Sequence, residues 1–162
     1  MKPVPPAEGV IRTVDKDGVS HEFPFTCEED SHEGDNAYDR LVMWAFRIQL
    51  ENDLFQYELV DENSRMRVQM MTRNDCDRYL AKGIPEAFIR LSFEIFRLPI
   101  VSSKNEVRRS PFNPLLEEFT EQHSPDADRV WKRLVSGGEA YFDESEGRYC
   151  HPRPKSEPDS QN

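Results

Sequence analysis

The stretch KGIPEAFIRLSFEIFRLPIVSS, residues 82–103, decides the fold. Pro85 suits the first turn of a helix, where a missing N–H removes no hydrogen bond. The segment Glu86–Arg97 carries apolar residues over so wide a face that it predicts a buried helix: Phe88, Ile89, Leu91, Phe93, Ile95 and Phe96. Leu98–Ser102 then predicts a short central strand. A buried helix followed at once by a central strand indicates an α/β core.

The residues before this stretch predict antiparallel strands. Val10–Phe25 fits a hairpin, because Asp17-Gly18 supplies the positive φ that its turn requires. Leu54–Val60 and Met66–Met70 predict two further strands joined by a polar turn. Between these pairs, Cys27–Asp35 is expected to be an acidic loop.

The segment from Asp35 to Leu50 fits two interpretations. Its apolar residues fall at helical spacing after a capping Asp35 or Asn36, which favours a helix: Tyr38, Leu41, Val42, Ala45 and Ile48. The run Leu41–Leu50 is equally compatible with a strand. The sequence leaves this choice open.

The residues after Ser103 predict a linker, a helix and a closing hairpin. Residues 104–124 are expected to be a linker with a short helix at Leu115–Glu121. Ser124-Pro125-Asp126 starts a helix that ends at Gly137-Gly138. Glu139–Phe142 and Arg148–Cys150 predict two strands. We therefore expect one α/β domain over residues 9–151, a flexible segment at 1–8 and a disordered tail at 152–162.

The composition limits the class of protein. The chain has 162 residues and a formal net charge of −10, from 31 acidic and 21 basic side chains. This balance disfavours general nucleic-acid binding, which depends on basic surfaces; the densest local basic cluster is Arg65, Arg67, Arg73 and Arg78. The three cysteines show no CxxC spacing, and neither a signal peptide nor a membrane span is evident. These features predict a cytoplasmic protein that does not bind membranes.

From Met66 to Tyr149 the chain resembles the GCN5-related N-acetyltransferase (GNAT) family. The resemblance rests on Lys82-Gly83-Ile84 opening a helix after a strand and a polar loop, and on the strand at Ile100-Val101-Ser102. It also rests on Asn105 and on the later run ADRVWKRL, residues 127–134, which is followed by a pair of glycines. The resemblance implies a GNAT-like mixed sheet flanked by helices, and acetyl-CoA as the cofactor.

The resemblance also implies where the cofactor would bind. The pyrophosphate of acetyl-CoA would lie at the N-terminus of the helix, held by Lys82, Gly83 and Ile84 with help from Arg78. Aligned on Gly83, Leu80 stands at the family's Arg or Gln position and Pro85 at its final small residue. Trp131 stands where the family has a tyrosine that protonates the leaving thiolate. Tyr141 or Tyr149 would have to take over that role in this chain.

Other residue groups have simpler explanations. Ser102-Ser103 with His123 and Asp126 would form a nucleophilic site, but the serines lack a Gly-x-Ser-x-Gly turn, and strand capping or ligand contact explains them better. His21, Cys27 and His32 lack the close spacing of zinc ligands, so no metal site is predicted. Adjacent Cys150 and His151 would point to opposite sides of a strand.

Two functions stay open on these grounds. The chain is either an acyl-CoA-dependent N-acyltransferase of unknown acceptor, or a catalytically inactive GNAT-like protein that binds a protein partner through its acidic surface. The acidic segment Glu28–Asp35 and the charged linker after Ser103 are the surfaces where such a partner is expected.

Overall fold

The structure is a computed structural model, and it describes residues 2–32, 41–74, 76–104, 106–109, 117–121 and 125–154. For residues 31, 32, 41, 106–109 and 117–121 it describes the backbone. Within these ranges the chain is one α/β domain, with an open mixed sheet of eight strands and two α-helices. None of the helices in these ranges has the length and apolar character needed to cross a membrane.

The first half of the sheet is an antiparallel meander. Its strands are β1 (Glu8–Val14), β2 (Ser20–His32), β3 (Leu41–Leu50), β4 (Asp53–Asp61) and β5 (Met66–Thr72). The predicted first hairpin is confirmed, and its turn holds Gly18 at φ 80°. The predicted strands at 54–60 and 66–70 are confirmed as β4 and β5. A polar linker with a 3₁₀ turn, η1 (Asp77–Tyr79), then leads to α1 (Ile84–Phe96).

In this half of the sheet the structure decides one open choice and shows that one expectation is wrong. Leu41–Leu50 is a strand rather than a helix, because it lies between β2 and β4 and pairs with both. The acidic segment is not a loop over Cys27–His32, since β2 continues along β3 as far as the pair His32 and Leu41. Glu28 and Glu29 are exposed there, so the extension keeps their carboxylates in water while the backbone hydrogen bonds to β3.

The second half of the sheet contains β6 (Ile100–Val101), β9 (Tyr141–Asp143) and β10 (Arg148–His151). Strand β6 runs parallel to β5 over the pairs Met66–Ile100 and Arg67–Val101, and β10 lies between β6 and β9. Helix α2 (Pro125–Ser136) confirms the predicted helix. A separate hairpin joins β7 (Glu106–Arg109) and β8 (Glu117–Glu121), so the expected short helix at Leu115–Glu121 is wrong over Glu117–Glu121.

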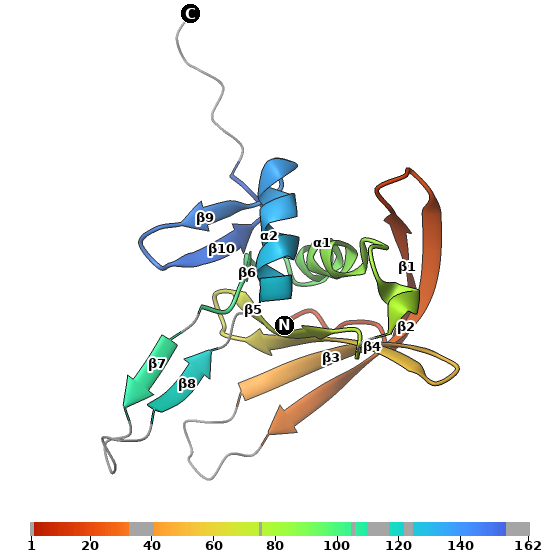
Figure 1. Cartoon of the computed structure of the whole chain (residues 1–162). Coiled ribbons are helices and arrows are strands. Elements are labelled where there is room, and N and C mark those ends of the chain that lie inside the picture. The colour runs from red at the N-terminus through yellow and green to blue at the C-terminus, as the bar shows by residue number, and fades with distance from the viewer. Residues whose placement is uncertain are drawn as a thin grey trace, which may run out of the picture.

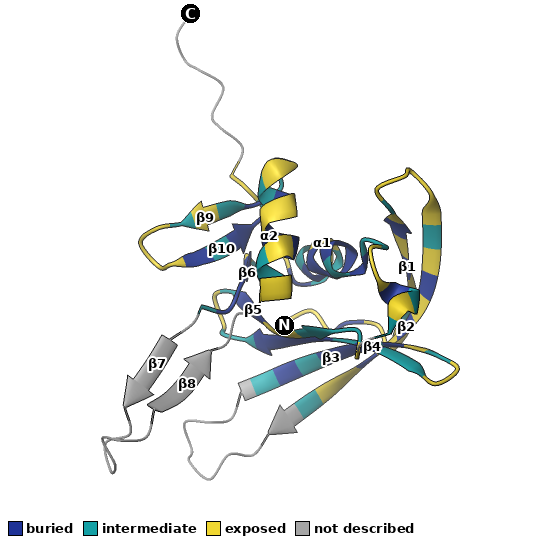
Figure 2. Ribbon diagram, in the orientation of Figure 1, coloured by how far each residue is buried: buried dark blue, intermediate teal, exposed yellow. Residues whose placement is uncertain are grey.

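Helix α1 lies across the sheet and contacts both of its halves, β1 at one end and β6 and β10 at the other (Figure 1). Figure 2 shows its residues mostly buried, as the sequence predicts. Phe88 makes the main aromatic contacts between this helix and the sheet. Its ring contacts four aromatic rings from β2, β3 and β4: Phe25, Phe46, Phe55 and Tyr57. The Tyr57 hydroxyl shares a 2.9 Å hydrogen bond with Ser92, whose hydroxyl donates to the Phe88 carbonyl. These contacts fix the helix against the meander.

We expect Phe88→Ala to lower the free energy of unfolding by about 4 kcal/mol, because the cavity left would adjoin four aromatic rings at once. Urea unfolding followed by tryptophan fluorescence measures this loss. Phe142→Ala is the control, since Phe142 is 47% exposed on β9 and should cost less than about 1 kcal/mol. Equal losses for the two variants would contradict the central role of Phe88.

Candidate functional site

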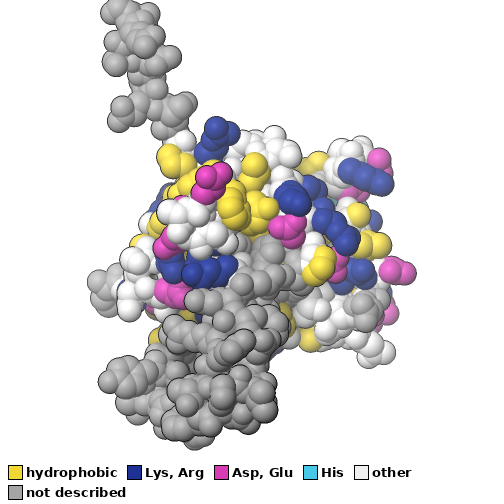
Figure 3. All heavy atoms as spheres, turned by 60° about the vertical axis from the view of Figure 1, so that its left-hand side comes forward, with side chains coloured by type: hydrophobic (Ala, Val, Ile, Leu, Met, Phe, Trp, Pro, Cys, Tyr) yellow, Lys and Arg dark blue, Asp and Glu magenta, His cyan; other side chains and the backbone are white. Residues whose placement is uncertain are grey.

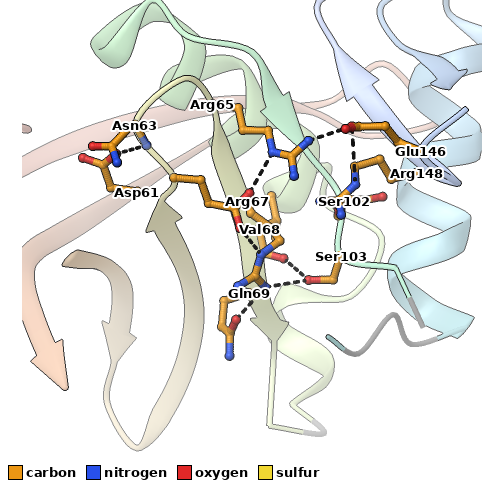
Figure 4. Close-up of polar contacts among 11 residues, drawn as sticks. Asp61, Asn63, Arg65, Arg67, Val68, Gln69, Ser102, Ser103, Glu146 and Arg148 are labelled. Atoms are coloured by element: carbon orange, nitrogen blue, oxygen red, sulfur yellow. Dashed lines mark hydrogen bonds and ion pairs between the residues drawn. The ribbon is translucent and has the colours of Figure 1, made fainter. Parts of the chain in front are cut away.

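Strands β5 and β6 separate after two residue pairs, and polar side chains fill the gap between them (Figure 4). Strand β5 has a bulge here, because the register shifts and leaves Gln69 without a partner residue on β4. The Ser103 hydroxyl lies in this gap and donates to the Val68 carbonyl at 2.6 Å. Ser103 thus replaces the backbone partner that Val68 loses as the strands diverge.

The buried guanidinium of Arg67 organises this gap. Its Nε donates to Glu62 at 3.1 Å, and its Nη1 donates to Gln69 at 2.8 Å and to the Ser103 hydroxyl at 3.3 Å. Glu62 also accepts from Arg65 at 2.8 Å. Burial raises the pKa of the Glu62 carboxyl, but the hydrogen bonds from Arg65 and Arg67 outweigh it, so the pKa lies below its ordinary value. We call Glu62, Arg65, Arg67, Gln69 and Ser103 the arginine–serine cluster.

A cavity of about 330 Å³ adjoins this cluster at the carboxyl end of β6, between α2 and the β9–β10 hairpin. Its lining residues combine lysines, an acid, hydroxyls and aromatic rings: Ser103, Lys104, Asp128, Lys132, Phe142 and Tyr149. Figure 3 shows the side of the molecule formed by α2, β9 and β10, where hydrophobic side chains gather between basic and acidic ones. Such a mixture suits a ligand that has both apolar and polar groups.

Tyr149 connects the cavity to helix α2. Its hydroxyl donates to Asp128 at 3.2 Å, and Asp128 also pairs with Lys132 at 2.9 Å. The ring of Tyr149 stacks on Trp131 and meets Phe142 edge-on. Burial raises the pKa of the Tyr149 hydroxyl, and the Asp128 carboxylate raises it further. The hydroxyl therefore stays protonated at neutral pH and can donate a proton or a hydrogen bond.

The four residues expected to hold cofactor phosphates lie at the other end of the sheet. Gly83 precedes α1 at φ 78°, and a Cβ placed on it would lie 3.1 Å from the Val14 carbonyl oxygen of β1. Lys82 is half-buried, and the side chain of Ile84 is fully buried in the core. Arg78 donates to the Leu50 carbonyl at 3.1 Å and pairs with Glu51 and Asp53 at the β3–β4 turn. The structure thus brings Gly83 to β1, and Arg78 to the β3–β4 turn.

The other candidate residues have structural contacts. Besides the Ser103 contacts described above, the Ser102 hydroxyl accepts the Tyr149 N–H at 2.9 Å, while His123 lies outside the described residues. His21 pairs with Asp15 and Cys27 is buried, and no cluster of metal-ligating side chains occurs among the residues that the structure describes. His151 Nδ1 meets the Glu139 carbonyl oxygen at 2.8 Å.

Each arginine of the basic cluster noted in the sequence is paired with an acid. Arg65 and Arg67 share Glu62, and Arg65 also reaches Glu146 at 2.6 Å. Arg73 lies 3.9 Å from Asp77, and Arg78 has the two partners already described. Each of these four arginines therefore has an acidic partner within the protein.

The sequence pointed to Ser102, Ser103 and Tyr149 as candidate site residues, but it indicated Arg67 only as part of a basic cluster and gave no role to Asp128 or Lys132. Arg67 lies in a strand whose residues alternate between apolar and polar, and this pattern predicts that an arginine faces solvent. In the structure its side chain is only 6% exposed. Asp128 and Lys132 are spaced four residues apart, the usual spacing of a helical ion pair. That spacing was the available signal, but it does not distinguish an ordinary surface pair from one beside a cavity.

We expect Glu62→Gln to lower the free energy of unfolding at pH 7 by about 2 kcal/mol, since it removes the ion pair between Glu62 and the buried guanidinium of Arg67. The folded-state pKa of Glu62 is lowered, so this stability is present above the ordinary value of 4.5 and is lost as the pH falls below it.

Urea unfolding between pH 7 and pH 3 measures the effect, and the two proteins should converge at the acid end. Glu22→Gln is the matched control, because both side chains of the Glu22–Arg12 pair are exposed. This pair should therefore contribute less than about 1 kcal/mol to the free energy of unfolding. A difference between wild type and Glu62→Gln that stays constant with pH would contradict the role given to the Glu62 carboxylate.

Comparison with known proteins gives no further assignment: no family model matches the chain, and no curated protein or solved structure matches it.

Proposed function

We propose that the protein is a GNAT-like binding domain that recognises a protein partner and does not transfer acyl groups. The observation that supports this most directly is the position of Gly83 against the end of β1. A bound pyrophosphate needs open backbone N–H groups at the helix N-terminus. Here the Val14 carbonyl oxygen, a hydrogen-bond acceptor, lies beside Gly83. Its partial negative charge would repel a phosphate.

The side chains expected to assist the cofactor support the same proposal. Arg78 already binds two carboxylates and a carbonyl group, so recruiting it for a phosphate would break those bonds. Pro85 has no N–H to offer at the first turn of α1. Trp131, at the position of the family's tyrosine, is 1% exposed and stacked on Tyr149. Its indole does not supply the proton that a departing thiolate requires.

The acidic end of β2 is the surface that we assign to the partner. Strand β1 begins at Glu8, opposite Thr26, so β2 extends beyond β1; past the bond from the Cys27 N–H to the Ala7 carbonyl, no described strand pairs with this edge of β2. Glu29 is exposed on this extension and Asp30 follows it, while the exposed Glu28 pairs with Arg47 of β3. Free strand edges bind extended segments through backbone hydrogen bonds. Carboxylates along this edge, in a chain of net charge −10, favour a segment that carries lysine or arginine.

Isothermal calorimetry with acetyl-CoA tests the first half of the proposal. We expect no binding up to millimolar cofactor, because the Val14 carbonyl oxygen lies beside Gly83 and Arg78 is engaged by Glu51, Asp53 and the Leu50 carbonyl. Lys82→Glu is the variant to compare, since Lys82 is partly accessible and its reversal leaves Gly83 and the helix unchanged. Micromolar binding that Lys82→Glu abolishes would contradict the proposal.

A lysine-rich peptide tests the second half. We expect Glu29→Lys to weaken binding of the peptide about tenfold, because the substitution places a like charge on the free edge of β2. Glu94→Lys is the matched control: it changes the net charge equally, but lies exposed on α1. Fluorescence anisotropy of a labelled peptide measures both, and equal losses would show that overall charge, rather than this edge, attracts the peptide.

A second function, acyl-CoA-dependent N-acyl transfer to an unknown acceptor, is supported by one observation. Tyr149 lines the cavity at the end of β6 with a hydroxyl that stays protonated at neutral pH, so it can act as the acid that Trp131 cannot. If acetyl-CoA binds, Tyr149→Phe should abolish transfer of the acetyl group to an amine, measured as release of free CoA when an amine acceptor is present, while leaving the calorimetric affinity for acetyl-CoA unchanged.

A further inference from the structure

Strand β1 is the last strand at one end of the sheet, and no strand in the described part of the chain pairs with its outer edge; at the Val14 end of that edge, Gly83 lies beside the Val14 carbonyl oxygen. Two hydrogen bonds show which backbone groups of this part of the chain point towards β2. They run from the Cys27 N–H to the Ala7 carbonyl and from the Asp15 N–H to the Val19 carbonyl. Hydrogen-bonded pairs alternate along an antiparallel ladder, so the odd-numbered residues of β1 bond to β2. The backbone groups of Glu8, Val10 and Arg12 therefore point away from the sheet.

Nothing in the described part of the chain hydrogen bonds to these outward backbone groups. Proteins usually protect such an edge with charged side chains, a covering element, a proline or a bulge. Residues 9–12 contain no proline, and the charged residues Glu8 and Arg12 lie on either side of Val10, which is 57% exposed. Val10 pairs with Pro24 of β2, so an apolar patch lies beside the free edge.

The charges on either side of Val10 are self-complementary. Glu8 and Arg12 lie two residues before and two residues after it, and all three side chains are exposed on one face of the strand. An antiparallel copy of the strand reverses this order. We propose that β1 pairs with β1 of a second copy of this chain, on a two-fold axis at Val10, so that Glu8 faces Arg12 of the partner subunit.

The strand allows few other registers. Only registers that place even-numbered residues opposite each other bring the outward backbone groups together. Moving the partner by two residues in either direction places a charged side chain opposite a valine or Pro6, and loses both ion pairs. The register centred on Val10 forms both pairs, brings the two valines together and makes about six backbone hydrogen bonds. It joins the two sheets into one.

The surface beside the edge has room for the partner's side chains. A hollow of about 430 Å³ lies next to β1 and is lined by Glu8, Val10, Pro24, Thr26, Arg47 and Gln49. In the proposed register the guanidinium of Arg12 of the partner subunit enters this hollow beside Glu8. The Thr26 hydroxyl and the Gln49 carboxamide line the same hollow and can accept from a guanidinium.

Sedimentation velocity of the full chain over the micromolar range, at physiological salt, tests the proposal. We expect a reversible monomer–dimer equilibrium. Glu8→Arg alone and Arg12→Glu alone should each weaken dimerisation at least about tenfold, because each places like charges opposite one another. The double variant Glu8→Arg with Arg12→Glu should restore dimerisation, since it exchanges the charges that face each other across the two-fold axis. Arg12→Glu alone and the double variant both lose the exposed pair of Arg12 with Glu22, so the difference between these two variants measures the contact between the subunits.

A proline substitution tests the backbone bonds separately. The N–H of Val10 points away from β2, so Val10→Pro should abolish dimerisation and leave the unfolding curve of the monomer nearly unchanged. Val4→Pro, outside β1, should leave dimerisation unchanged. A wild type that stays monomeric throughout the range, or a double variant no tighter than the single ones, would overturn the proposal.

Discussion

The packing of Phe88 against the sheet is the interaction on which the rest of the structure depends. Its ring meets Phe25 of β2, Phe46 of β3, and Phe55 and Tyr57 of β4. These strands are neighbours in the sheet but belong to different hairpins, so one side chain of α1 holds the meander together. Because α1 also contacts β6 and β10, the same helix joins the two halves, which share only two residue pairs between β5 and β6 in the described sheet.

Much of this fold could be predicted from the sequence, because the decisive elements have strong local signals. The buried helix shows an apolar face, α2 shows a capping segment and a terminal glycine pair, and the first hairpin shows its turn. The errors came where local signals were ambiguous. Leu41–Leu50 satisfies both periodicities, and only its place between two strands decides in favour of a strand. The end of β2 is acidic, and its pairing with β3 overrides a composition typical of loops.

The candidate site was less predictable, for a physical reason. Its central residue, Arg67, is buried because β5 has a bulge at Gln69 and diverges from β6. No local pattern in the sequence predicts that divergence. Neither the cavity nor the position of Val14 beside Gly83 could be read from spacing, since each joins segments far apart in the chain. The expected cofactor residues could be located individually, but their surroundings depend on β1 and on the β3–β4 turn.

The placement of β10 between β6 and β9 has a consequence for how the chain acquires its structure. Strands β1 to β5 each pair with the strand next in sequence, so their contacts are local and can form early, while the chain is still being synthesised. The pairing of β6 with β10 spans about fifty residues and waits for the last strand. Until then, the carboxyl end of β6 and the hydroxyls of Ser102 and Ser103 remain without the strand that completes their surroundings. The cavity thus cannot be complete before β10 pairs with β6.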